Sequence, residues 1–199
     1  HAEANNVGNA VANPQDPLAG YKDLARAVAA SGIKAITGDI VVDDRLFQPF
    51  DFRGEYLANA VFVNDNLIDV QMSPTQVGQP AEVVFSPVSE AFSVVSTLQT
   101  TAGDAAPEVE LAGGGCFDVP GCQGTVSGSL SLQGKPVITG VYPLLRTFRI
   151  NQPSNYARTV FIEALRAEGI AVTAATVAAN PTNLLTTASY PAETRVAEL

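Results

Sequence analysis

Two stretches of the chain repeat the same spacing of apolar residues. In each, large apolar side chains stand eight and four positions before a Gly-Ile pair, which is the spacing of one helix face. These positions are Leu24 and Val28 before Gly32, and Phe161 and Leu165 before Gly169. Pro153 suits the first turn of the second helix. Residues 24–36 and 161–173 therefore each predict a helix, a glycine stop and a short strand.

The tetrapeptide from Ser31 to Lys34 matches Ser-x-x-Lys, in which a serine attacks an acyl carbon and a lysine helps to take its proton. That chemistry needs the serine at the start of a helix, because residues i and i+3 then share one face. Here the helical pattern precedes the motif, and an extended pattern follows it. We therefore predict that Ser31 ends a helix and that Lys34 lies on a strand and points away from it.

Between about residues 60 and 150 the pattern changes to short apolar or alternating stretches, separated by clusters of Pro, Gly, Asn and Asp. This rhythm is typical of antiparallel β-structure. We predict an α+β fold with two parts. Residues 1–61 and 145–199 form a discontinuous domain of two helices and an antiparallel sheet, and residues 62–144 form an all-β domain inserted into it.

Composition narrows the possible partners. The chain has 199 residues, of which 46% are hydrophobic, and a net charge of −9. The negative charge disfavours nucleic acid and anionic membrane surfaces as partners. No apolar run approaches the ~20 residues of a membrane span.

Two cysteines, Cys116 and Cys122, flank Pro120 and Gly121, which can turn the chain back between them. We predict a disulfide, which would constrain the unfolded chain by only about 2 kcal/mol because the loop is so small. Two reduced thiols are the alternative. A disulfide favours an exported protein. His1 is the only histidine, so the cysteines lack further ligands for zinc, and we expect neither a metal nor a cofactor.

Two groups of polar residues resemble sites of other kinds. Asp39, Asp43 and Asp44 could form an acid–base pair, but carboxylates beside a short strand are usually solvated turn residues. Asn64, Asp65 and Asn66 suggest calcium ligands, yet the glycine and distal glutamate of an EF-hand loop are absent. We predict a β-turn for residues 64–66.

Three stretches of the chain contain recognisable motifs, in order and with β-structure between them. The first holds Asp16-Pro17-Leu18, Gly32-Ile33, Gly38 to Asp43, and Phe47. The second is AVFVNDNLIDVQMSPTQVGQPAEV, and the third is RTFRINQPSNYARTVFIEALRAEGIAV. Together they resemble the class C low-molecular-mass penicillin-binding proteins, which are D-alanyl-D-alanine carboxypeptidase/endopeptidases.

The resemblance implies that this chain is the accessory region of such an enzyme. In the family, accessory domains are inserted into the catalytic domain between its Ser-x-x-Lys motif and its Ser-x-Asn and Lys-Thr-Gly motifs. Neither of the latter occurs here. We therefore expect a chain that is inactive alone, with the catalytic transpeptidase-like domain and the peptidoglycan stem peptide as partners, in an extracytoplasmic location. The alternative is an independent β-rich module that binds peptidoglycan or a protein.

The resemblance also suggests a substrate contact. In the family, an acidic residue and an aromatic residue five positions later help to hold the diaminopimelate side chain of the stem peptide. Asp51 and Tyr56 have that spacing, although the family's tryptophan before the acidic residue is missing. A carboxylate can pair with the ammonium group while a ring packs on the methylenes. The alternative is a turn residue and a residue of the core.

Overall fold

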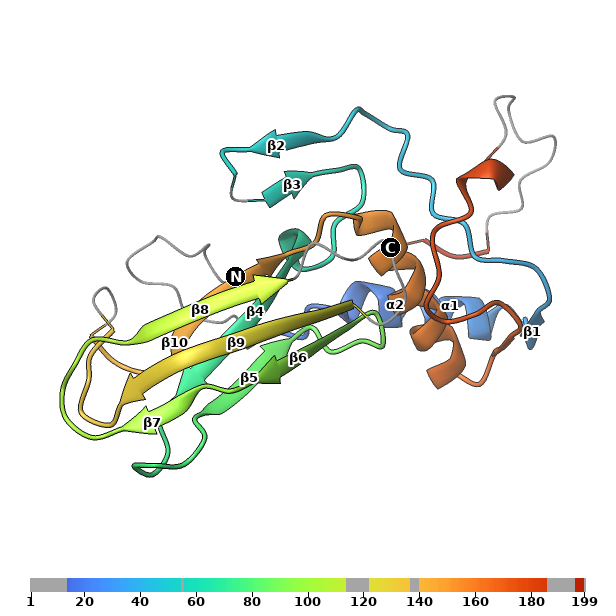
Figure 1. Cartoon of the computed structure of the whole chain (residues 1–199). Coiled ribbons are helices and arrows are strands. Elements are labelled where there is room, and N and C mark those ends of the chain that lie inside the picture. Colours follow the sequence, from blue (N-terminus) through green and yellow to red (C-terminus); the bar gives the residue numbers. More distant parts are fainter. Residues whose placement is uncertain (1–13, 55, 114–121, 137–139, 186–195, 199) are drawn as a thin grey trace.

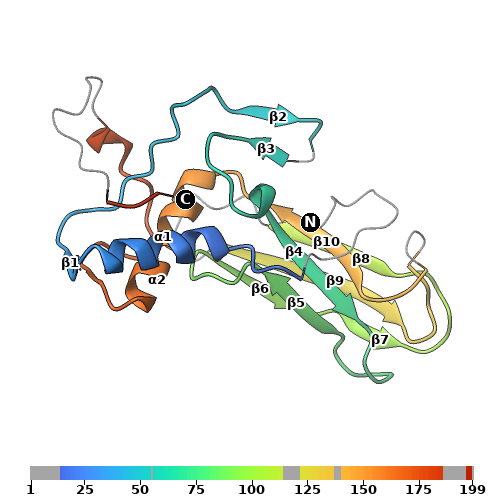
Figure 2. The same ribbon diagram turned by 180° about the vertical axis from the view of Figure 1, so that it is seen from behind.

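A computed structural model describes residues 14–54, 56–113, 122–136, 140–185 and 196–198 (Figure 1). Within these ranges the fold is α+β, with two helices and several small sheets. The helices gather at one end of the molecule, and the two larger sheets extend from them (Figures 1 and 2).

Both predicted helices are confirmed. Helix α1 spans Ala19–Ala30 and α2 spans Pro153–Ala167, with the proline in its first turn. The glycine that follows each helix has a positive φ, +93° at Gly32 and +78° at Gly169. A residue without Cβ adopts this conformation at little cost, so each glycine ends its helix as predicted.

The two similar stretches lie side by side. Strand β1 (Ala35–Ile36) pairs with β11 (Ala171–Val172) in parallel, and α1 packs against α2. Their shared apolar residues form a small core, the helix cluster, which contains Ala25, Val28, Ile162, Ala164, Leu165, Ile170 and Val172. The repeated pattern in the sequence is therefore a repeated structural unit whose two copies bury one another's apolar faces.

Three sheets lie outside the helix cluster. One is antiparallel, with β4 (Leu67–Ser73) between β5 (Glu82–Ser86) and β10 (Leu144–Arg149). A second consists of β6 (Phe92–Ser96), β7 (Gln99–Thr101), β8 (Glu108–Gly113) and β9 (Cys122–Ser131). The third is a hairpin of β2 (Phe50–Phe52) and β3 (Tyr56–Ala58). Short 3-10 turns occupy Asn64–Asn66 and Thr182–Leu184.

The expectation of purely antiparallel sheets was wrong for the β1–β11 pair, which is parallel, and for β9. This strand pairs with β6 and with β7 in parallel, and only with β8 in the antiparallel sense. Strand β8 runs back from β7, and β9 reverses again, so β9 runs in the direction of β6 and β7 and lies between them and β8 (Figure 1). Alternation in a sequence fixes which side chains face the core, but it does not fix the direction of the neighbouring strand.

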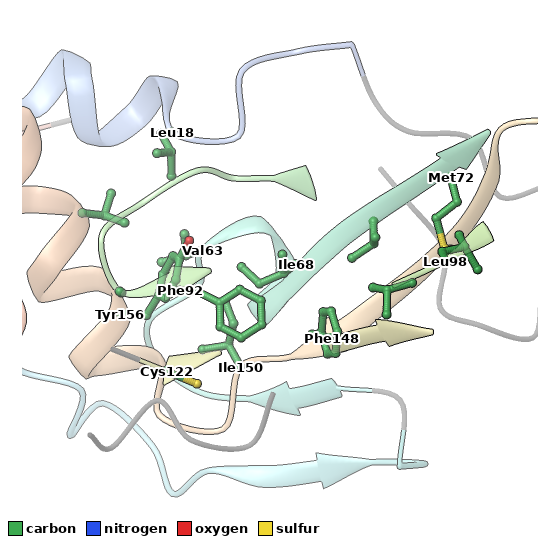
Figure 3. Packing of buried hydrophobic residues seen from close by; sticks show 14 of the residues in the cluster. Leu18, Val63, Ile68, Met72, Phe92, Leu98, Cys122, Phe148, Ile150 and Tyr156 are labelled. Atoms are coloured by element: carbon green, nitrogen blue, oxygen red, sulfur yellow. The ribbon is translucent and has the colours of Figure 1, made fainter. Parts of the chain in front are cut away.

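The main core lies between the two larger sheets and reaches the start of α2 (Figure 3). The rings of Phe92 and Phe148 meet edge to face at 5.3 Å between centroids. Gly124 passes so close to them that an added Cβ would lie 2.6 Å from Phe148 Cζ and 2.7 Å from Phe92 Cζ. Only glycine fits at this position, because any side chain would push the two rings apart.

The main core joins both predicted parts of the chain. Leu18 and Tyr156, from the predicted discontinuous domain, belong to the same cluster as Ile68 and Phe92 (Figure 3). The helix cluster, in contrast, draws only on residues of the predicted discontinuous domain. The division into residues 1–61 with 145–199 and residues 62–144 stays a prediction.

Candidate functional site

The candidate site is the β2–β3 hairpin, which lies apart from the two larger sheets (Figures 1 and 2). In its ladder Asp51 stands opposite Leu57, and Phe52 stands opposite Tyr56. Residues directly opposite one another share a face, and successive residues alternate between faces. Asp51 and Tyr56, both predicted from the sequence, therefore project from opposite faces of the hairpin.

The Asp51 carboxylate has two strong partners. Its Oδ1 accepts a hydrogen bond from the Gly54 backbone N–H at 2.5 Å, and its Oδ2 lies 2.5 Å from Nη2 of Arg149. The Gly54 N–H, and then the Arg149 guanidinium, hold the pKa of Asp51 below its usual range. The carboxylate is thus ionised at neutral pH and links the hairpin to the end of β10.

Aromatic rings cover the other face of the hairpin. The Phe52 and Tyr56 rings lie 5.2 Å apart, and the Arg53 guanidinium carbon lies 5.2 Å from the Phe52 centroid. Phe50 and Phe52 are 54% and 37% exposed. This face offers ring surfaces to a ligand, while the opposite face offers a charged carboxylate.

The turn after β3 fixes the position of the hairpin. Asn64, Asp65 and Asn66 all have positive φ values, between 50° and 58°, and the Asn66 N–H donates to the Val63 carbonyl at 2.8 Å. This bond closes the predicted β-turn, and Asn and Asp tolerate the left-handed backbone better than other side chains. The Asn66 side chain, fully buried, donates from Nδ2 to the Leu57 carbonyl at 2.8 Å. The residues that resembled calcium ligands thus hold β3 in place.

The three aspartates near β1 have separate structural partners. Asp39 accepts two hydrogen bonds from the buried Arg158, at 3.0 Å from Nε and 2.5 Å from Nη2. Asp43 pairs with Arg45, and Asp44 accepts a hydrogen bond from the Ser154 hydroxyl. Asp39 is exposed, as expected of a carboxylate beside a short strand, but it is also the counter-charge of a buried arginine. Sequence reasoning missed this pair and the Asp51–Arg149 pair, because the partners lie far apart in the chain.

The remaining predicted sites are only partly described. Cys122 is buried at the start of β9, and Cys116 lies outside the described residues, so their disulfide stays a prediction. Across the described ranges, no group of three or more His, Cys, Asp or Glu side chains is placed to hold a metal ion. In the same ranges, neither helix has the length and apolar character required to cross a membrane.

Two solved structures share this fold. Penicillin-binding protein 4 (dacB) from Haemophilus influenzae matches with a TM-score of 0.54 and 18% identity, over 75% of this chain and 33% of that chain. A structure of penicillin-binding protein 4 from the same organism, complexed with a novel β-lactam, gives 0.52 and 18%, over 85% of this chain and 38% of that one. This chain therefore spans between a third and two fifths of the length of these proteins.

A family model gives the assignment by sequence. No protein with a curated description matches the chain. The model of the D-Ala-D-Ala carboxypeptidase 3 (S13) family matches residues 9–199, which is nearly the whole sequence. This match confirms the resemblance to penicillin-binding proteins, and the chain belongs to the D-Ala-D-Ala carboxypeptidase 3 (S13) family.

Proposed function

We propose that this chain is the non-catalytic accessory region of a serine-type D-alanyl-D-alanine carboxypeptidase/endopeptidase. One observation carries the proposal: the chain matches the S13 family over residues 9–199, yet spans only 33% to 38% of the matched penicillin-binding proteins. The sequence also holds no Ser-x-Asn and no Lys-Thr-Gly. The role of such a region is to orient the substrate or to position the catalytic domain.

The environment of Ser31 supports this proposal. Its hydroxyl donates a hydrogen bond to the Val28 carbonyl at 2.7 Å, back toward the helix that it ends. The next residue, Gly32, turns the chain out of the helix, and Lys34 precedes β1. A serine nucleophile needs a base beside it and donors for the oxyanion, and this helix end provides neither arrangement.

The isolated chain is expected to form no covalent adduct with penicillin. Labelling with a fluorescent penicillin, followed by gel electrophoresis and intact-mass measurement, tests this expectation. A full-length penicillin-binding protein provides the positive control. A stoichiometric adduct that disappears in Ser31→Ala would contradict the proposal, because it would make Ser31 the nucleophile.

The partners follow from the proposed role. They are the catalytic transpeptidase-like domain of the parent enzyme and the peptidoglycan stem peptide, whose end is the D-alanyl-D-alanine named in the family description. Peptidoglycan lies outside the cytoplasm, so the proposed location is periplasmic or associated with the cell wall. A disulfide between Cys116 and Cys122 would suit such an oxidising compartment.

The β2–β3 hairpin is the proposed contact with substrate. The Asp51 side chain is 51% exposed, and a carboxylate with two partners keeps lone pairs for a third, such as the ammonium group of a diaminopimelate side chain. Tyr56 lies on the opposite face of the hairpin, with Phe52 beside it. The two residues would thus contact substrate from separate faces, and their contributions should be independent.

In the complete enzyme, Asp51→Ala and Tyr56→Ala are each expected to lower turnover of peptides that contain diaminopimelate by roughly tenfold, the first through the lost charged contact and the second through the lost ring contact. Turnover of a simple D-Ala-D-Ala mimic, which lacks that side chain, should change little. The double variant should show the product of the two single effects, because residues without contact act additively. Asp104→Ala, at an exposed position, is the control for lost negative charge. Equal losses on both substrates would rule out this contact.

A further inference from the structure

A polar cavity of about 350 Å³ lies between the segment that precedes α1 and the antiparallel sheet. Residues 14–17, which precede α1, line one side of it, and the turn at Asn64 and strands β4 and β5 line the rest. Its described lining contains two carboxylates, Asp16 and Asp69, with no Lys or Arg among the lining residues. Asn64, Gln71 and Ser86 add further polar atoms.

Strand alternation explains how these groups meet. On β4, Ile68, Val70 and Met72 face the main core, so Asp69 and Gln71 project from the other face. Ser86 on β5 stands directly opposite Asp69 and shares that face. The cavity is therefore built on the second face of the antiparallel sheet.

Asp69 is buried here and only half satisfied. It is 6% exposed, and its Oδ2 accepts a hydrogen bond from Asn64 Nδ2 at 3.1 Å. Its Oδ1 is also buried, and no hydrogen-bond donor reaches it. A buried carboxylate oxygen without a donor is costly, and its presence beside a cavity indicates a ligand that donates.

Asp16 adds a second negative charge at the cavity. Its Oδ1 accepts from the Leu18 N–H at 2.9 Å, and its Oδ2 accepts from Lys22 Nζ at 2.5 Å. The hydrogen bond from Lys22 is the main reason why the pKa of Asp16 is lowered, so this carboxylate is ionised. Lys22 compensates the charge of Asp16, so Asp69 is the carboxylate of the described lining that lacks a cation beside it, and the lining is rich in acceptors.

We propose that this cavity binds a primary ammonium group at the end of an aliphatic chain, with Asp69 Oδ1 as the principal acceptor. An ammonium group donates three hydrogen bonds from one atom, which suits a single free carboxylate oxygen. A guanidinium group binds best to both oxygens of a carboxylate, and Asn64 already occupies the other oxygen of Asp69. Among the described residues, no group of three or more His, Cys, Asp or Glu side chains is placed to surround a metal ion, so the lining favours an ammonium group over a divalent cation.

Two probes test the proposal on the 199-residue chain, with backbone amide shifts as the readout. Nα-acetyl-lysine methylamide represents a lysine of a polypeptide, and 1,5-diaminopentane represents a small free amine. We expect one or both to shift the amides of Asp69, Gln71 and Ser86 at millimolar concentration. Preference for the lysine probe identifies a polypeptide partner, and preference for the diamine, or equal binding, identifies a small amine.

The matched variants are Asp69→Asn and Asp104→Asn, each of which removes one negative charge. Asp69→Asn keeps an oxygen that can accept from Asn64 but lacks the free carboxylate oxygen, so it should bind the probes roughly tenfold or more weakly. The Asp104→Asn variant should bind them within about twofold of the unchanged chain. In the unchanged chain, burial raises the pKa of Asp69, and a bound ammonium should lower it, as carboxyl ¹³C shifts would report.

Three results would overturn the proposal. The first is that neither probe shifts these amides or the pKa of Asp69. The second is that Asp69→Asn binds the probes as tightly as the unchanged chain. The third is that calcium chloride shifts the same amides at lower concentration and excludes both probes, which would make the cavity a metal site.

Discussion

Replacement of Arg158 by alanine is expected to lower the free energy of unfolding by about 2–5 kcal/mol, because it deletes a fully buried side chain, leaves a cavity and removes several hydrogen bonds at once. The Arg158 side chain is 1% exposed. It donates from Nε and Nη2 to Asp39, from Nε to the Ile40 carbonyl at 3.1 Å, and from Nη1 to the Ala175 carbonyl at 3.0 Å. The variant would leave a cavity in place of the buried guanidinium and would remove the donor shared by these acceptors.

Chemical denaturation followed by circular dichroism measures the effect. The matched control is Arg45→Ala, which breaks an ion pair with Asp43 of similar length at 2.6 Å, but between side chains that are 45% and 42% exposed. This control should lose at most about 1 kcal/mol, because water already screens the pair. Arg158→Lys should lie between the two, since it keeps the charge but offers fewer donors. Equal losses in Arg158→Ala and Arg45→Ala would contradict a structural role for Arg158.

The part of the fold that could be predicted is the part that depends on local chemistry. Gly32 and Gly169 end their helices because a positive φ favours glycine whatever surrounds it. Pro153 marks a helix start for an equally local reason. The turn at Asn64 to Asn66 follows from the tolerance of these side chains for a left-handed backbone.

What could not be predicted depends on contacts between distant parts of the chain. Arg158 lies two positions after Tyr156 on α2. The spacing of apolar residues in the sequence indicated that this helix has one buried face. Helix α2 is instead buried on most sides, so its arginine is buried as well. Its partner Asp39 lies 119 residues earlier, and no local pattern reveals this pairing. The parallel direction of β9 is equally a property of the whole sheet.

The candidate site also combines features that the sequence indicated with features that depend on contacts between distant parts of the chain. Asp51 and Tyr56 were proposed from their spacing in a resembling family, and spacing alone does not fix the register of the hairpin. The observed ladder sets Asp51 against Leu57 and thereby separates the two side chains. Arg149, which pairs with Asp51, comes from a strand 98 positions later and gave no signal in the sequence. A one-residue change of register would have put both predicted residues on one face.

Replacement of Asn66 by aspartate is expected to destabilise the chain by about 2–4 kcal/mol, because it puts a charged acceptor where a buried donor is required. Nδ2 of Asn66 donates to the carbonyls of Leu57, at 2.8 Å, and Val61, at 3.3 Å. Its Oδ1 accepts from the Val63 N–H at 3.1 Å. An aspartate keeps the last bond but sets an oxygen against two carbonyls.

Two further variants of Asn66 separate the loss of its hydrogen bonds from the strain in its backbone, and a variant of Asp65 is the control. Asn66→Ala loses all three side-chain hydrogen bonds and also strains the backbone, whose φ is +58° at this position. Asn66→Gly loses the same hydrogen bonds without the strain, so it should be about 1 kcal/mol less destabilised than Asn66→Ala. Asp65→Asn makes the reverse chemical change at the exposed neighbouring position and should cost about 1 kcal/mol or less.

Hydrogen exchange shows whether the effect reaches the hairpin. Because Asn66 binds the Leu57 carbonyl, its loss should speed amide exchange in β2 and β3 more than in β4, where the ladder to β10 remains. The Asp65→Asn variant should leave the exchange of all three strands unchanged. If Asn66→Asp were as stable as the unchanged chain, or if its hairpin exchanged no faster, the buried amide would not be what positions the hairpin that carries Asp51 and Tyr56.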